Sequence, residues 1–106
     1  MQKVININGE GVTVEMSADT LRVYRQTFGR DLMVDMTRLS EQMDMEVVEN
    51  LMYICVKACN DIPEINEWLK SLPPTALYGE AAVELIKMWS DNNSTSSISR
   101  KKKADQ

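Results

Sequence analysis

Histidine is absent from the 106-residue chain. Without it, no Ser-His or Cys-His pair is available to activate a nucleophile. The sequence also lacks a Gly-rich phosphate-binding loop and a cluster of metal ligands. Because no convergent set of catalytic side chains is visible, we expect that the protein is not an enzyme and holds no metal ion or other cofactor.

Cysteine is scarce as well. The two cysteines, Cys55 and Cys59, stand four residues apart in a helical pattern and therefore share one helix face. A regular helix does not bring such a pair into disulfide geometry. A metal ion would need further soft ligands, which the chain does not have. We therefore expect two buried free thiols.

Long apolar runs are missing too. The longest, Leu51 to Val56, is far shorter than a membrane span, and Lys3 is followed by an alternating pattern rather than by the apolar core of a signal peptide. We therefore expect no membrane partner and a location in the cytoplasm.

Positive charge is scarce in most of the chain. Residues 1–92 have a net charge of −7, from 8 Lys and Arg against 15 Asp and Glu, whereas residues 93–106 have 4 against 1 and a net charge of +3. An acidic body repels phosphate groups, so we expect no nucleic-acid partner. Residues 93–106 have almost no apolar side chains, and we expect them to form a disordered basic tail.

What the sequence does contain is a β-rich start followed by helical periodicity. Two runs, 4–8 and 12–16, flank a turn signal at Gly9–Gly11 and predict a β-hairpin, which must pack on helices or on another subunit to be stable. The apolar spacing that follows predicts about five helices, over 21–28, 31–39, 46–60, 61–72 and 75–89. The predicted fold is α+β and mainly α-helical, with one domain over residues 1–92.

The helix predicted at 46–60 is apolar around most of its circumference and should form the centre of the core. Carboxylates at helical spacing occur elsewhere, as Asp31 with Asp35 and as Glu80 with Glu84. A solvated acidic face explains these pairs better than acid/base catalysis does.

The segment Tyr24–Leu32 is the most distinctive in the chain. Aromatic residues at 24 and 28 are one helical turn apart and should anchor a helix end in the core. Gly29 permits a tight reversal, after which Arg30 and Asp31 can brace the turn by ion pairing or capping. A helix–Gly–helix corner explains this segment without any function.

The hairpin-forming start and the pattern Leu-x-x-Tyr-Arg-x-x-Phe-Gly-Arg-Asp-Leu resemble the tail assembly chaperones of siphophages and prophages of Gram-positive bacteria. The matching residues here are Leu21, Tyr24, Arg25, Phe28, Gly29, Arg30, Asp31 and Leu32. The resemblance extends in order and spacing over residues 1–92, through Tyr53, through Glu67-Trp68-Leu69, and through Leu85 with Trp89.

This resemblance implies an α+β domain that binds the tape measure protein, a very long helical chain rich in apolar surface. Family members keep that chain soluble, help to bring tail tube subunits to it, and leave before the tail matures. The resemblance thus implies a protein of the host bacterial cytoplasm that is absent from the mature virion. Self-association is left open.

Methionine is abundant, with 8 residues, and methionine-rich surfaces adapt to their partners by repacking. Four methionines on or beside the helix predicted at 31–39 are candidate partner contacts: Met33, Met36, Met43 and Met45. A place in the core is an equally good explanation for Met33 and Met36.

Two other classes of function compete with the chaperone. One is a different phage interaction protein, either a head–tail connector or a host-directed adaptor. The other is a small regulator that uses the basic tail on nucleic acid, which the acidic body and the lack of a helix with several Arg or Lys residues disfavour.

Overall fold

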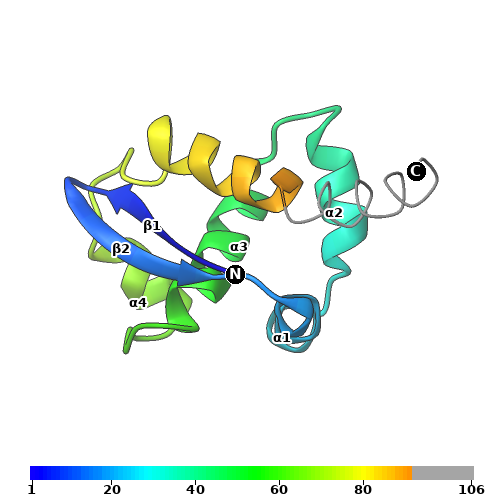
Figure 1. Ribbon diagram of the computed structural model, residues 1–106, viewed down its shortest axis with the longest axis horizontal. Helices are drawn as coiled ribbons and strands as arrows, with labels where there is room; N and C mark the ends of the chain where they lie inside the picture. Colours follow the sequence, from blue (N-terminus) through cyan, green and yellow to red (C-terminus); the bar gives the residue numbers. More distant parts are fainter. Residues whose placement is uncertain (92–106) are drawn as a thin grey trace, which may run out of the picture.

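A computed structural model describes residues 1–91 of the chain, and the predicted basic tail, 93–106, lies outside the described residues. Within the described part, a β-hairpin precedes five helices, which agrees with the predicted α+β class (Figure 1). The elements are β1 (Gln2–Ile7), β2 (Glu10–Glu15), α1 (Ala18–Phe28), α2 (Leu32–Leu39), α3 (Met45–Lys57), α4 (Ile65–Lys70) and an unlabelled helix over 80–91.

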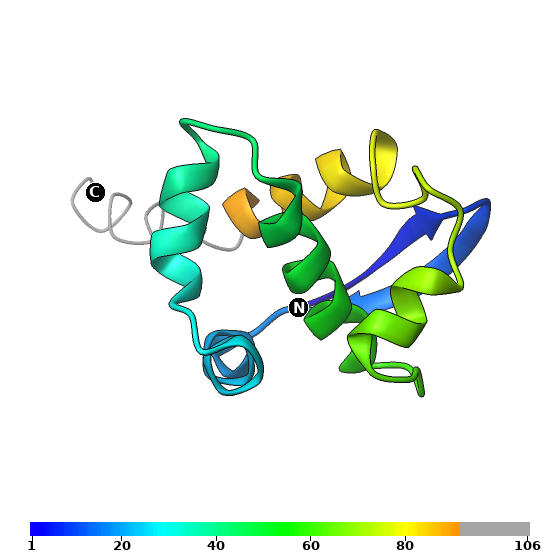
Figure 2. The same ribbon diagram turned by 180° about the vertical axis from the view of Figure 1, so that it is seen from behind.

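Helix α3 runs through the middle of the molecule, with α1 and α2 on one side and the hairpin and α4 on the other (Figures 1 and 2). All residues from Asn50 to Val56 are buried. The helix over 80–91 also contributes to the core, since Leu85 and Met88 are buried. The predicted core helix is therefore confirmed, because an almost wholly apolar helix is stable in water only when other elements surround it.

The hairpin turn lies at Asn8-Gly9, not at Gly9–Gly11 as the sequence analysis predicted. Asn8 and Gly9 have φ values of 54° and 82°, and Ile7 pairs with Glu10 across the turn. A two-residue hairpin loop needs positive φ at both central residues, and Asn followed by Gly is the pair that adopts it at least cost. Glu10 and Gly11 therefore belong to β2.

One face of the hairpin packs on the helices through Ile5, Ile7 and Val14, all of which are buried. The Asn60 side-chain amide donates to the Thr13 carbonyl oxygen at 2.8 Å and holds β2 to the end of α3. On β1, Lys3 Nζ lies 2.7 Å from a carboxylate oxygen of Glu84 on the helix over 80–91. The hairpin thus packs on helices, as expected, and Glu84 has an ion-pair partner that the sequence did not predict.

Two predicted helix starts were wrong. Helix α4 begins at Ile65 with Glu64 as its cap, rather than at Asp61, because a residue before proline is held in an extended conformation and Ile62 precedes Pro63. The last helix begins at residue 80 rather than at Thr75. Gly79 precedes it with a left-handed φ of 65°, which a right-handed helix does not contain.

The corner between α1 and α2 forms as the sequence predicts. Ser17 caps α1. Gly29 ends this helix with a φ of 68°, and its N–H donates to the Arg25 carbonyl oxygen at 2.7 Å. Asp31 caps α2 by accepting hydrogen bonds from the backbone N–H groups of Met33 and Val34. Three residues, 29–31, therefore connect α1 to α2 and turn the chain between them.

Candidate functional site

A buried carboxylate lies at the centre of this corner. The Asp35 side chain on α2 is only 2% exposed. Its two oxygens accept hydrogen bonds from Nε and Nη2 of Arg30, both at 2.8 Å, and one of them also accepts from the Tyr24 hydroxyl at 2.9 Å. A two-point guanidinium–carboxylate contact is the strongest hydrogen-bonded pair that side chains form. The interpretation of Asp35 as part of a solvated acidic face was therefore wrong.

Local sequence brings these groups together. Tyr24 lies in the second half of α1, where it is fully buried with its ring 5.1 Å from that of Phe28. The reversal at Gly29 then turns the chain so that Arg30 and the first turns of α2 face the end of α1. Asp35 lies on the inner side of α2 with Leu32, which is also buried. The network is therefore built almost entirely from residues 24–35.

Asn50 adds a contribution from α3 that the sequence analysis missed. This residue is 8% exposed in a helix that is otherwise apolar on its inner faces. Its side chain lies near Tyr24 and lowers the pKa of that hydroxyl, against the larger effect of burial. A single amide within an apolar helix was the available signal, since a buried polar group normally has a partner. Asn50 therefore places a polar group of α3 beside the contacts between α1 and α2.

The charges of this network are fixed around neutral pH. Burial, followed by the hydrogen bond to Asp35, raises the pKa of Tyr24 above its usual range, so this hydroxyl stays protonated. The Arg30 guanidinium holds the pKa of Asp35 below its usual value, and the hydrogen bond from Tyr24 lowers it further. The Asp35 carboxylate raises the pKa of Arg30 in return. The network is thus a neutral hydroxyl and an intact ion pair, which together brace the corner.

The exposed side of α2 is apolar in its first turn, at Met33 and Val34, and polar further along, at Thr37 and Arg38. Met33 and Val34 are each 49% exposed, and Met43 in the following loop is 62% exposed. We call these three residues the methionine surface. Of the other two candidate contacts, Met36 lies in the core and Met45 is half-buried at the start of α3. The structure therefore leaves Met33 and Met43 accessible to a partner and assigns Met36 to the core, as the alternative explanation expected.

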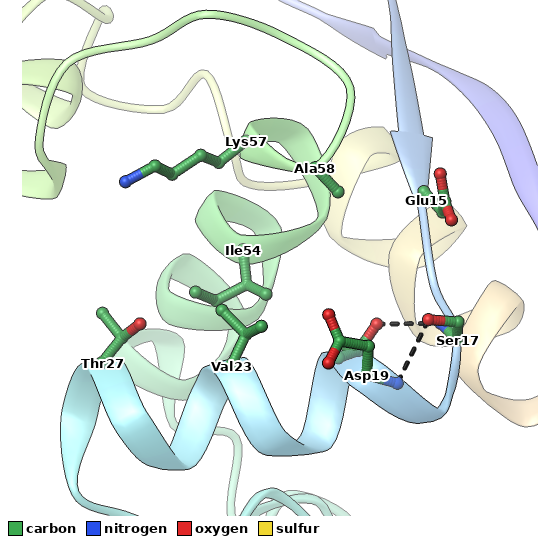
Figure 3. A pocket seen from close by; sticks show the side chains of 9 residues that line it. Glu15, Ser17, Asp19, Val23, Thr27, Ile54, Lys57 and Ala58 are labelled. Carbon is green, nitrogen blue, oxygen red and sulfur yellow. Dashed lines mark hydrogen bonds between the residues drawn. The ribbon is translucent and has the colours of Figure 1, made fainter.

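A groove between α1 and α3, with a volume of about 360 Å³, was not predicted from the sequence (Figure 3). Val23 and Ile54 face each other across it, from α1 and α3 respectively. The Lys57 side chain extends away from the carboxylates of Glu15 and Asp19 (Figure 3). The groove therefore offers an apolar floor with charges at its ends, and its charged groups do not converge on one point.

The two thiols differ in their surroundings. Cys55 is buried, and burial raises its pKa to about 12. Cys59 is only half-buried, with its Sγ 3.8 Å from a carboxylate oxygen of Glu15, so the expectation of two buried thiols was wrong for Cys59. The position at the end of α3 explains this, because the helix emerges from the core there. Among residues 1–91, no group of three or more Cys, Asp or Glu side chains is arranged to hold a metal ion.

Within the same described residues, no helix is both long and apolar enough to cross a membrane. Comparisons of the chain with protein-family models, with curated proteins and with solved structures find no match. The motif on which the family resemblance rests consists of Tyr24, Arg25, Phe28, Gly29, Arg30 and Asp31. What the structure shows of this segment is its contacts, and those contacts build the corner between α1 and α2.

The network predicts a specific loss of stability when Asp35 is neutralised. Asp35→Asn removes the negative charge that pairs with Arg30 and accepts a hydrogen bond from Tyr24. This substitution should lower the free energy of unfolding by about 2 kcal/mol. Urea denaturation followed by circular dichroism measures this. Arg22→Gln is the matched control, since it removes the exposed ion pair between Arg22 and Asp19 and should change stability by less than about 0.5 kcal/mol. Equal effects of the two substitutions would contradict the account.

The stability difference between the wild type and Asp35→Asn should also depend on pH. Because folding lowers the pKa of Asp35, its ionised form stabilises the protein above the unfolded-state pKa of about 4, and this stabilisation is lost as the pH falls through the folded-state pKa. Urea denaturation should thus give a constant difference from about pH 7 to pH 5 and a shrinking one below about pH 4. A difference that stays constant down to about pH 2.5 would show that the Asp35 charge is not its source.

Proposed function

We propose that this protein is a tail assembly chaperone that binds an apolar helical chain, the tape measure protein, keeps it soluble and helps to recruit tail tube subunits. The ordered resemblance over residues 1–92 supports this proposal. The observation that carries it is that α2, whose inner side packs into the core, exposes two neighbouring apolar residues in its first turn, Met33 and Val34.

A surface helix normally turns polar residues to the water, so two neighbouring exposed apolar residues in its first turn are a candidate contact for a partner. Leu32 and Leu39 are buried on the inner side of α2. The Arg30–Asp35 ion pair fixes the same side, so the exposed residues occupy a defined position. Met33 and Met43 have flexible, polarizable side chains that adapt to irregular apolar partners. The methionine surface is therefore suited to a partner whose apolar residues vary along its length.

Such a surface does not need high affinity at each contact. A tape measure protein presents many apolar stretches on one chain, and several bound copies together cover what one copy cannot. Each copy would contribute a few weak apolar contacts and then be released when tail tube subunits replace it. We infer that the chaperone acts in the host cytoplasm and is absent from the finished virion.

Co-expression tests this function directly. The wild-type protein should raise the soluble yield of its cognate tape measure protein several-fold, and the double variant Met33→Gln, Met43→Gln should lose most of that effect. Val83→Gln is the control, since Val83 is as exposed as Met43 but lies on the helix over 80–91. An unchanged soluble yield with wild-type protein, when both chains are well expressed, would contradict the chaperone proposal. Equal losses from the double variant and the control would contradict the assignment of the surface.

A further inference from the structure

The segment that connects α2 to α3 and begins α3 carries charge of one sign. Residues 39–56 contain no Lys or Arg but include Glu41, Asp44, Glu46 and Glu49. Asp44 is the N-terminal cap of α3. The other three form no ion pair with residues 1–91. Burial, followed by repulsion from Glu46 and Asp44, raises the pKa of Glu49. The negative charge here is therefore only partly balanced, by Arg30 near Glu46 and by Arg38 near Asp44.

An apolar side chain stands among these carboxylates. Met43 is 62% exposed, and Met45 is half-buried beside it in the sequence. We call residues 41–49 the acidic methionine face. Its carboxylates favour a polypeptide segment that carries several cations, because such a segment supplies their counterions.

The chain has such a segment in residues 93–106. Four of these residues are basic, Arg100, Lys101, Lys102 and Lys103, against the single acidic residue Asp105. The described chain stops at Asp91, at the end of the helix over 80–91, and this end lies toward α2 and the first turns of α3 in Figures 1 and 2. Eight residues separate Asp91 from Arg100, and the nine steps of an extended chain between them span about 30 Å. A segment of that length starts from the side of the molecule on which α2 and the first turns of α3 lie.

Some other carboxylates on the surface already have partners. Glu84 pairs with Lys3, and Asp19 pairs with Arg22. The Glu64 carboxylate accepts the backbone N–H of Glu67 at the start of α4. Two cations lie near the acidic methionine face: Arg30, whose guanidinium is already bound to Asp35, and Arg38, which lines a small pocket with Gln42 and Asp44.

We propose that residues 93–106 dock on the acidic methionine face of the same chain, with the cations at 100–103 against Glu41, Glu46 and Glu49. Tethering gives the segment a high effective concentration, so weak exposed contacts suffice. The docked segment covers Met43 and competes with any partner that uses this residue. This inference stands without the proposed function, because it concerns contacts within one chain.

Backbone amide chemical shifts of the labelled full-length protein test the docking. Neutralising all four cations at 100–103 to Gln should shift the amide resonances of residues 41–49 at about 20 mM salt. The difference between the variant and the wild type should disappear near 0.5 M salt, where the screening length falls to a few ångströms. The reciprocal variant carries Glu41→Gln, Glu46→Gln and Glu49→Gln, and should shift the resonances of residues 100–103. Asp44 is left unchanged because it caps α3.

A matched control neutralises a different acidic surface, with Asp61→Asn and Glu67→Gln at the start of α4, and should leave the resonances of residues 100–103 in place. The proposal is overturned if neutralising the cations leaves residues 41–49 unchanged at low salt. It is also overturned if the control shifts residues 100–103 as much as the reciprocal variant does. Shifts that grow with protein concentration would assign the contact to a second copy and likewise overturn it.

Discussion

The contact between the Arg30 guanidinium and the buried Asp35 carboxylate is the interaction on which the arrangement of α1 and α2 depends. A carboxylate removed from water destabilises a protein strongly unless it is paired and hydrogen-bonded. Here the two-point contact with Arg30 and the Tyr24 hydroxyl meet that requirement. Because the partners come from α1, from the turn and from α2, the same contacts that stabilise the charge also set the angle between the two helices.

Fixing that angle has a consequence for α2. The helix has eight residues, too few to be stable in isolation, so it depends on its packing. With its inner side held by Asp35 and by buried Leu32, the outer side presents Met33 and Val34 at a defined place. In the proposed chaperone this corner positions an adaptable apolar contact. The motif that gives the family resemblance and the surface that would bind the partner are therefore joined by one ion pair.

Sequence patterns predicted the parts of this arrangement that depend on backbone chemistry. Gly29 and Asp31 were identified as the reversal and the cap because left-handed φ and N-terminal capping restrict residue type strongly. The burial of Asp35 was missed, since its spacing from Asp31 is the same whether the carboxylate faces water or a partner. Asn50 was missed because its neighbour in the structure, Tyr24, is distant in sequence. Tertiary pairing of polar groups leaves no periodic signal.

Hydrogen exchange of the amides in α2 tests most directly whether the ion pair holds this helix in place. In Asp35→Asn, the amides of residues 36–39 should exchange much faster than in the wild type. The exchange rates of the amides at the centre of α3 should change only as much as the free energy of global unfolding requires. Such a local loss of protection is what the account predicts. An equal change across α2 and α3, or unchanged protection in α2, would contradict it.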